Sequence, residues 1–232
     1  MCGQINIDRN ICSDLSGYSL GVPYRPTART EARRLDTRSK VVSAALGLLA
    51  DGGYQAATMA DVARLAEVGI GTLYRQFPSK PELFREAYRI ASSRELQVVA
   101  EALAREGSAA DRMALAVRES AGRALTGRTL GRVLLVEPAD SLVEAERLRF
   151  RADYRDLFAA TIAEGIQRGE FPPQDPQLSA TALMGAIVEV LFGPISPVGD
   201  ETNRRSDQVA EALVAHCRGA LNASVGVRPV AP

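Results

Sequence analysis

Apolar residues recur along most of the chain with the spacing of one helix face, and strand-like alternation does not. The first such face follows Asp36 and occupies positions i, i+3, i+4, i+7 and i+8: Val41, Ala44, Ala45, Leu48 and Leu49. Gly52 and Gly53 then supply a C-terminal stop, because glycine tolerates the left-handed backbone that ends many helices. We therefore predict a first helix that begins near Asp36 and ends at these glycines.

Capping boxes mark the starts of later helices, because a Ser or Thr oxygen and an acidic side chain three residues on satisfy free N–H groups. The boxes are Thr58–Asp61, Ser79–Glu82, Ser108–Asp111 and Ser141–Glu144. A second helix should run from the first box to about Ala66, a short third over Ile70–Phe77, and a long fourth toward Arg105. Ends or breaks are expected at Gly127, Glu137–Pro138, Gly169, Pro172, Pro173, Pro176 and Gly193–Pro197, before a last helix around Thr202–Leu221. The pattern predicts an all-α fold of about nine helices, the first three short and closely spaced.

The same pattern divides the chain into four segments. Residues 1–34 and 223–232 lack periodicity and contain several prolines, so we expect a flexible leader and a flexible tail. Residues 35–84 hold the short helices, and residues 85–222 hold the long ones. The 232 residues exceed a usual single domain of roughly 100–150 residues, which favours two domains.

Composition favours a cytoplasmic protein with no membrane partner. Hydrophobic residues make up 46% of the chain, yet no apolar run approaches the roughly 20 residues that cross a bilayer. The N-terminal residues lack the basic segment and apolar block of a secretory signal. Cys2, Cys12 and Cys217 are too few and too scattered for a disulfide framework or a zinc site, so we expect reduced thiols, no metal and no cofactor.

Charge is distributed unevenly although the net charge is zero. Residues 25–90 contain eleven Lys and Arg against seven Asp and Glu, whereas residues 91–232 contain sixteen against nineteen. The basic footprint expected of a surface that contacts nucleic acid is therefore confined to the N-terminal third.

Residues 58–77 meet the requirements of a helix-turn-helix, in which one helix braces a second that enters the major groove of DNA. One side of each helix is predicted to form the small core: Val62, Ala63, Leu65, Ala66, Val68, Leu73 and Phe77. Leu73 and Phe77 are spaced i, i+4, which leaves Thr72, Arg75 and Gln76 pointing elsewhere.

The residues left outside this core have suitable chemistry. Arg75 can donate two hydrogen bonds to guanine, and Gln76 can pair with adenine, each good pair contributing roughly 1–3 kcal/mol of discrimination. Thr72, Tyr74 and Lys80 offer groups for phosphate oxygens, which fix register without reading sequence. Thr58 at a helix N-terminus adds backbone N–H groups and the positive end of a helix dipole.

The stretch ATMADVARLAEVGIGTLYRQFPSKPELF resembles the DNA-binding domain of the TetR family of bacterial transcriptional regulators. The GTLY-x-x-F-x-x-K signature, preceded by DVA and followed by ELF, carries the resemblance within residues Thr37–Phe84. It implies phosphate contacts at Thr58, Thr72, Tyr74 and Lys80, and base contacts among Gly69, Ile70, Arg75 and Gln76. Met59 and Gly71 complete the candidate DNA-binding set, in which the glycines allow close approach of the backbone.

Glu67 departs from the family pattern, which usually has glycine at this turn position. Such a turn tends to need a left-handed backbone, and a non-glycine residue there costs roughly 1 kcal/mol. We expect the carboxylate to weaken phosphate contact or to pair with Arg64, without abolishing the motif.

The resemblance further implies a homodimer on a palindromic operator in double-stranded DNA, and a small-molecule effector that binds among the central helices and releases the DNA. Candidate dimer residues come from Ala180–Ile195 and the last helix: Leu183, Ile187, Leu191, Val209, Leu213 and His216. Candidate ligand-binding residues are Phe150, Tyr154, Phe158 and Glu189. The three aromatic residues also fit an ordinary helical core, and Glu189 also fits an interface or an exposed position.

Other interpretations remain open at this point. The protein could be a transcriptional activator, a ligand-independent DNA-binding protein, or a helical adaptor in which residues 58–77 are only a corner of the core. An enzyme is the remote alternative, since removal of Met1 would expose Cys2 as in N-terminal-cysteine amidotransferases. No strand pattern follows Cys2, so we expect a protein without catalytic residues.

Overall fold

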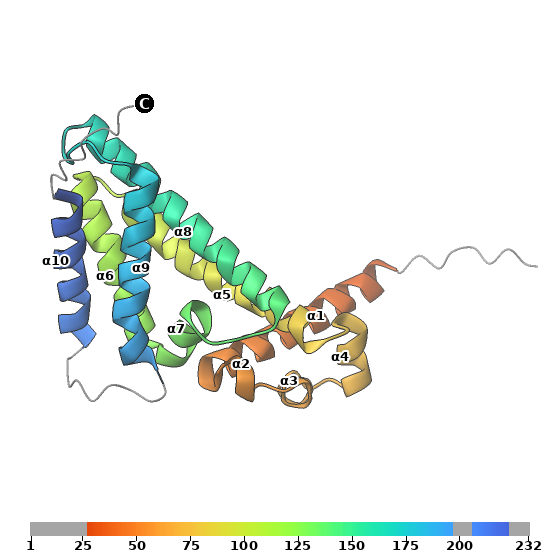
Figure 1. Cartoon of the computed structure of the whole chain (residues 1–232). Helices are drawn as coiled ribbons and strands as arrows, with labels where there is room; N and C mark the ends of the chain where they lie inside the picture. Colours follow the sequence, from red (N-terminus) through yellow and green to blue (C-terminus); the bar gives the residue numbers. More distant parts are fainter. Residues whose placement is uncertain (1–26, 197–205, 223–232) are drawn as a thin grey trace, which may run out of the picture. The chain divides into compact units, whose positions relative to one another are not determined.

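The computed structural model describes residues 27–196 and 206–222, and within these ranges it contains ten helices and no strand (Figure 1). The prediction of an all-α fold is therefore confirmed. The helices are α1 (Ala28–Asp51), α2 (Gly53–Ala56), α3 (Met59–Leu65), α4 (Ile70–Gln76), α5 (Lys80–Leu103), α6 (Ala109–Thr126), α7 (Arg128–Leu135), α8 (Ser141–Gln167), α9 (Pro176–Ile195) and α10 (Ser206–Asn222). The described residues before Thr37 belong to one compact unit and those from Thr37 onward to another, and the contacts discussed below from Thr37 onward lie within the second.

Helix α1 begins at Ala28, eight residues before the predicted start. Thr27 caps it, because the Thr27 hydroxyl accepts a hydrogen bond from the Thr30 N–H at 3.2 Å. Glu31 and Arg34 form an ion pair at 2.6 Å on the next turn. These first turns are polar and exposed, so they carry no apolar periodicity by which the sequence could reveal them. The predicted leader is thus partly helical, while residues 1–26 and the predicted tail lie outside the described residues.

Three of the four predicted capping boxes begin helices. The hydroxyl oxygens of Thr58, Ser79 and Ser108 accept hydrogen bonds from the N–H groups three residues later, at 3.1, 3.4 and 3.0 Å. The fourth is wrong, because Asp140 occupies the N-cap of α8 and Ser141 is already helical. The extra helix relative to the prediction is explained by α2, a single turn that follows the expected glycine stop.

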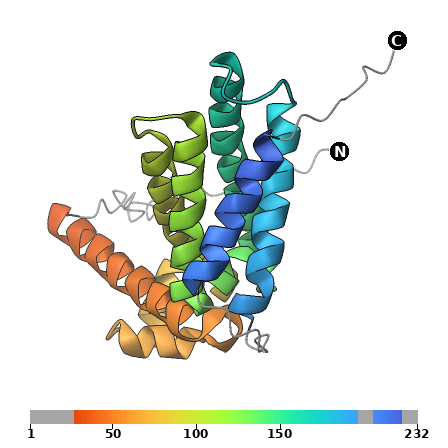
Figure 2. The same cartoon turned by 90° about the vertical axis from the view of Figure 1, so that its left-hand side faces the viewer.

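The larger helices pack into a bundle in which α5 contacts α6 and α8, α9 contacts α8, and α10 contacts α6. In Figure 2, α10 and α9 lie side by side toward the viewer. Gly165 near the end of α8 allows close packing, since a Cβ there would lie 2.3 Å from the Phe171 ring. Helix α5 runs unbroken across residue 84, so the boundary predicted there falls inside a helix.

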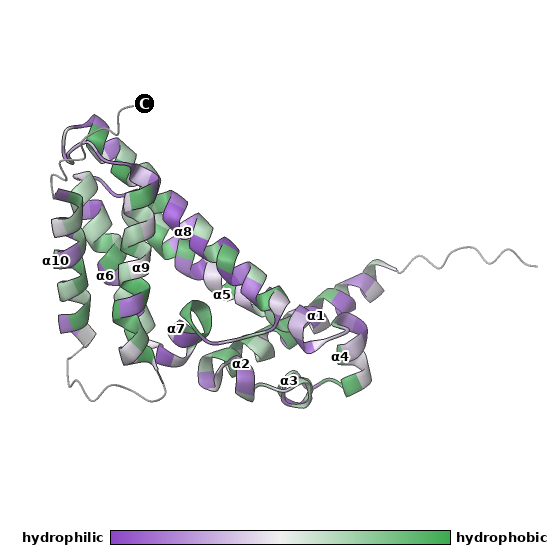
Figure 3. Cartoon of the chain, in the orientation of Figure 1, coloured by the Kyte–Doolittle hydropathy of each residue, from purple (hydrophilic) through white to green (hydrophobic). Residues whose placement is uncertain are grey.

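Helix α9 is the most apolar helix and, by length and composition, the one described helix that could cross a membrane. Its apolar character is visible in Figure 3. This corrects the expectation that no apolar run approaches that length. Leu183, Ile187 and Leu191 are buried against the rest of the bundle, whereas Leu178, Val190 and Phe192 are exposed. Helix α9 is therefore a core helix whose outer side keeps exposed apolar residues beside Glu189.

Candidate nucleic-acid interface and ligand cavity

Helices α3 and α4 form the predicted helix-turn-helix. Val62, Ala63 and Ala66 of the first helix and Leu73 and Phe77 of the second are buried in one core. The Val68 N–H donates to the Ala63 carbonyl at 3.0 Å and closes the turn between them. The short helices are thereby held at a fixed geometry by packing and by a closed turn.

Glu67 occupies the left-handed region with φ of 54°, the one non-glycine residue among the described residues with positive φ. Its N–H donates to the Arg64 carbonyl at 3.2 Å, and its side chain is exposed. Arg64 pairs with Asp61 at 3.2 Å and not with Glu67. The Glu67 carboxylate therefore remains exposed beside α4, the second helix of the helix-turn-helix.

The outer face of this corner carries most of the predicted DNA-binding residues. Ile70 and Tyr74 are 48% and 47% exposed. Thr58, Gly69, Gly71 and Arg75 are also exposed, while Thr72, Gln76 and Lys80 are half-buried. Arg75 donates a hydrogen bond to the Thr72 hydroxyl at 2.8 Å, so the two side chains lie together on this face. Tyr74 and Arg75 therefore present donors to the solvent, with Thr72 beside Arg75.

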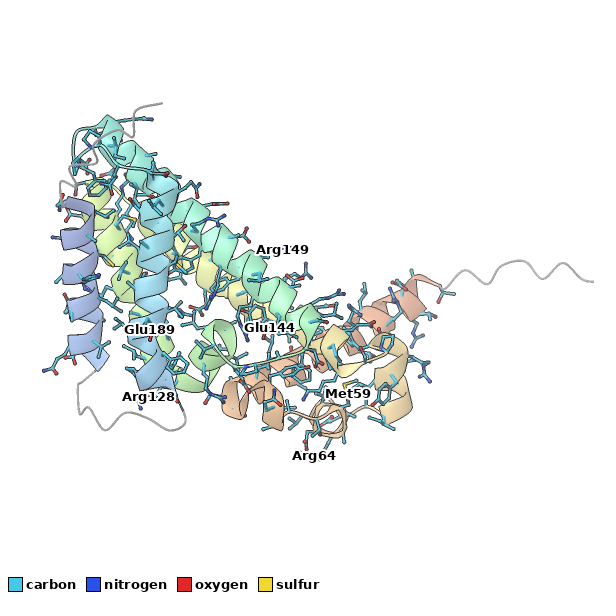
Figure 4. All side chains as sticks on the ribbon, viewed as in Figure 1. Met59, Arg64, Arg128, Glu144, Arg149 and Glu189 are labelled. Carbon is cyan, nitrogen blue, oxygen red and sulfur yellow. The ribbon has the colours of Figure 1, made fainter. Side chains whose placement is uncertain are left out.

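Two predicted placements are wrong. Met59 is buried, because it begins the inner face that continues three and four residues later at Val62 and Ala63. Its side chain therefore cannot contact DNA. Leu65 is 49% exposed, because it lies off that inner stripe. Figure 4 shows Met59 on the inner side of α3 and Arg64 on the outer side.

Two cations lie over aromatic rings at this corner. The Lys80 ammonium lies 4.4 Å from the centroid of the Tyr54 ring, and burial lowers the pKa of Lys80. The Arg38 guanidinium lies 4.2 Å from the centroid of the Phe77 ring and donates to the Gln76 carbonyl at 3.3 Å. Arg38 also pairs with Glu86 of α5. Arg38 was not identified from the sequence, because the spacing of residues along one helix carries no signal of a contact with Gln76, 38 residues away.

The segment between α7 and α8 contacts the single-turn helix α2. The buried Glu137 carboxylate accepts a hydrogen bond from the Gln55 N–H at 3.0 Å, and the Gln55 amide donates to the Pro138 carbonyl at 2.8 Å. The Tyr54 hydroxyl donates to Asp140. Gly53 has φ of 82°, and a Cβ there would lie 2.6 Å from Glu137 Oε2. The connector thus lies directly against the helix that precedes α3.

The same connector is tied to α5 and α8. Arg147 of α8 is buried and donates to the carbonyls of Val133, at 3.0 Å, and Glu137. The Tyr88 hydroxyl of α5 donates to the Leu134 carbonyl at 2.7 Å, and burial raises the pKa of this phenol. Helix α7 and the connector after it are therefore hydrogen-bonded both to α5 and α8 of the bundle and to α2, the helix before α3.

A cavity of about 670 Å³ lies on the other side of α7. Its lining includes the following side chains and glycines: Glu95, Val98, Arg118, Glu119, Ser120, Gly122, Arg123, Ala124, Thr126, Gly127, Leu130, Gly131, Leu134, Leu135, Phe150, Tyr154, Met184, Ile187, Val188 and Leu191. Gly131 brings α7 close to α6, since a Cβ there would lie 2.8 Å from the Ala124 carbonyl oxygen. A volume in the range of roughly 300–1,000 Å³ suits a small-molecule site.

The cavity includes two of the four residues predicted to bind a ligand. Phe150 and Tyr154 line it with rings that pack edge to face. Phe158 lies outside the lining because it is fully buried in the helical core. Glu189 lies outside it because it points from the exposed face of α9, as Figure 4 shows. Among the described residues, no three His, Cys, Asp or Glu side chains gather as metal ligands would.

The predicted dimer residues lie mostly on the wrong faces of their helices. Leu183, Ile187, Leu191, Val209 and Leu213 are buried within the subunit, and of the set His216 alone is exposed. The most apolar positions of an amphipathic helix are the ones that its own core takes first. The exposed faces instead carry the following apolar and small residues: Leu178, Ala182, Gly185, Val190 and Phe192 on α9, and Ala212, Ala215, Gly219 and Ala220 on α10.

Two family models match this chain. Residues 41–87 match the model described as bacterial regulatory proteins, tetR family. Residues 106–191 match a tetracyclin repressor-like C-terminal domain. The first match covers the helix-turn-helix, and the second covers most of the cavity's lining.

Curated relatives are similar over parts of the chain. The HTH-type transcriptional repressor KstR of Mycolicibacterium smegmatis is 45% identical over 58 residues, which span 25% of this chain and 28% of KstR. The HTH-type transcriptional regulator YhgD of Bacillus subtilis is 27% identical over 168 residues, which span 68% of this chain and 84% of that protein.

A solved structure shares the fold. FadR from Bacillus subtilis, determined in complex with stearoyl-CoA, has a TM-score of 0.66 at 18% identity, with 78% of this chain and 98% of FadR covered. At this identity the likeness concerns the arrangement of helices alone.

Proposed function

Since the chain belongs to the tetR family of bacterial regulatory proteins, which are DNA-binding transcriptional regulators and not enzymes, we propose that it is a ligand-responsive repressor. It binds a palindromic operator as a homodimer and is released by a small molecule. The observation that carries this proposal is the connector between α7 and α8, which joins the lining of the cavity to the helices before the turn.

The outer face of α3 and α4 is the proposed DNA-binding surface. Arg75 and Gln76 supply the base-reading groups, and Ile70 offers an apolar contact for a thymine methyl group. Thr58, Thr72, Tyr74 and Lys80 contact phosphates, and Gly69 and Gly71 let the backbone approach. Because few side chains read bases, most of the affinity comes from phosphates and falls steeply with salt.

The dimer forms through the uncovered faces of α9 and α10. The two helices lie side by side in Figure 2, and their uncovered faces carry the exposed Leu178, Val190 and Phe192 on α9 and small residues on α10. Exposed apolar residues on two adjacent helices mark an association site, and the exposed Glu189 of α9 lies among them. Two recognition helices then occupy half-sites one turn of DNA, or a multiple of it, apart.

Release requires the ligand to bind more tightly to the state that does not bind DNA. A ligand in the cavity displaces Leu134 or Leu135 of α7, and the following Glu137 carries that displacement to Gln55. A coupling free energy of 1–3 kcal/mol between the two sites means that the bound ligand lowers the affinity for DNA by about 5–150-fold. KstR is described as a repressor, and stearoyl-CoA is bound by FadR, which favours repression and an apolar effector here.

Selection of bound sequences from random double-stranded DNA tests the proposal. The expected product of the selection is a palindrome with two short half-sites, which a dimer binds. In the cell, this dimer acts in the bacterial cytoplasm. A reporter gene placed behind that sequence then separates repression from activation, because a repressor lowers expression and an activator raises it. Enrichment of no sequence, or of one half-site without its repeat, would contradict the proposed binding mode.

A further inference from the structure

The cavity contains little charge that is free to meet a ligand. Within the described residues its lining has two acidic and two basic side chains, Glu95, Glu119, Arg118 and Arg123. The Arg123 guanidinium donates to both carboxylate oxygens of Glu95, at 2.7 and 2.6 Å. Arg118 donates in the same way to both carboxylate oxygens of Glu211 in α10. Both guanidinium groups of the lining are therefore already paired with a carboxylate.

The charged side chains of the lining balance, since two carboxylates face two guanidinium groups. Glu119 makes no hydrogen bond or ion pair with another described residue, whereas Arg118 and Arg123 are both paired with carboxylates. An anionic ligand would have to displace Glu95 or Glu211 from its arginine. Loss of Arg123 would leave the mostly buried Glu95 carboxylate, 18% exposed, without its partner.

The buried part of the lining is apolar and has one strong hydrogen-bonding group. Leu134, Phe150, Met184, Ile187 and Leu191 are all less than a tenth exposed, and Tyr154 lies among them. Burial raises the pKa of the Tyr154 phenol, and the nearby Ser120 hydroxyl opposes only part of that rise. The phenol therefore stays protonated and can donate to a ligand.

Ser120 complements this donor. Its hydroxyl donates to the Val117 carbonyl at 3.2 Å within α6, which leaves its oxygen lone pairs to accept. A donor and an acceptor side by side in a mostly apolar lining, whose two arginines are already paired with carboxylates, match a hydroxyl or carbonyl group on a ligand. They do not match an ion, because an ion buried without a partner loses its hydration.

We propose that the effector is an uncharged lipophilic molecule with one hydroxyl or carbonyl oxygen, which binds at Tyr154 and Ser120. The inference rests on the proposed effector role of the cavity and specifies its ligand class. It distinguishes this cavity from one that binds carboxylates or the phosphates of a coenzyme A thioester.

Three probes with one chain length test the ligand class on the full-length protein without DNA: 1-dodecanol, dodecanoate and dodecylammonium. Their dissociation constants are measured by calorimetry at pH 7, below the solubility limit of dodecanol and below the concentrations at which the two ions form micelles. Dodecanol is expected to bind at least tenfold more tightly than either ion. Tighter or equal binding of dodecanoate or dodecylammonium, or no binding of any probe, overturns the proposal.

Two variants locate the bound oxygen. Tyr154→Phe and Ser120→Ala should each weaken dodecanol binding by about fivefold, which corresponds to one lost hydrogen bond. Ser93→Ala is the matched control, because it removes an exposed hydroxyl from α5 outside this cavity. Equal affinity of Tyr154→Phe and the unaltered protein for dodecanol overturns the assignment, provided that circular dichroism shows both to be folded.

Release of the selected operator separates this inference from the proposed function. Dodecanol that binds at Tyr154 without releasing DNA supports the ligand class and contradicts the ligand-responsive repressor. DNA that is released by dodecanoate and not by dodecanol supports the repressor and overturns the ligand class.

Discussion

The Glu137 carboxylate accepts a hydrogen bond from the Gln55 N–H at 3.0 Å, across 82 residues of sequence. Free N–H groups at the start of a helix need an acceptor, and α2 has no side-chain cap of its own. A residue that follows the cavity-lining helix α7 therefore supplies the acceptor for a helix that precedes the turn.

Glu137→Gln should weaken communication between the cavity and DNA. The amide oxygen can still accept from the Gln55 N–H, but the contact with Arg132, at 3.3 Å from Glu137 Oε2, loses its charge. We expect the ligand's effect on operator affinity to fall by about 0.5–2 kcal/mol. Operator dissociation constants measured with and without ligand give this value. An unchanged ratio in a folded variant would argue against transmission through this residue.

Gly53→Ala should destabilise the fold by about 1–3 kcal/mol. The backbone has positive φ there, and the new Cβ would meet Glu137 and Arg132 at 2.6 and 2.7 Å. Gly47→Ala is the matched control, since Gly47 lies inside α1 with nothing within 4 Å of a new Cβ, and should gain about 0.5–1 kcal/mol. Thermal unfolding of both variants measures the difference, and a Gly53→Ala variant as stable as Gly47→Ala is the contrary result.

Glu67→Gly should raise both stability and DNA affinity. Relief of the left-handed strain is worth about 1 kcal/mol, which shifts Tm by about 2–4 °C in a chain of this size. Glu67→Gln separates the two effects, because it removes the charge and keeps the strain. We expect both variants to bind the operator more tightly, and we expect Glu67→Gly alone to have a higher Tm. A rise in Tm for glutamine of the same size would contradict the role of backbone strain.

Arg75→Ala should reduce discrimination at one operator position by about 1–3 kcal/mol. Arg149→Ala is the control, because Arg149 is an exposed arginine on α8, away from the turn in Figure 4. Competition between the selected operator and versions with single base changes measures the loss. If Arg75→Ala weakened all sequences alike, Arg75 would be a phosphate contact.

Ala215→Glu should disrupt the proposed dimer. The substitution places a carboxylate on the exposed small-residue face of α10, and a twofold axis brings in a second copy of the charge. Light scattering should report a monomer, and affinity for the palindrome should fall at least about tenfold because two half-sites no longer bind together. Ala160→Glu on the exposed side of α8 should remain dimeric. A dimeric Ala215→Glu would place the interface elsewhere.

Local signals in the sequence determined much of the fold. Apolar periodicity and the caps at Thr58, Ser79 and Ser108 depend on neighbours within a few residues, so they located the helices. The helix-turn-helix also followed, apart from the faces of Met59 and Leu65, because its inner and outer faces are set by helical spacing. The polar start of α1 and the single turn of α2 did not, since neither has an apolar stripe.

Only the tertiary structure decided which apolar residues face outward and which polar residues meet. Periodicity selected Leu183 and Leu213 for an interface, yet packing within the subunit buries them and leaves Phe192 and Ala215 outside. Likewise, the contacts of Glu137 with Gln55 and of Tyr154 with the cavity join segments far apart in the chain. Long-range packing places these groups, and the free energy that holds them there has no signature in the spacing of residues along one helix.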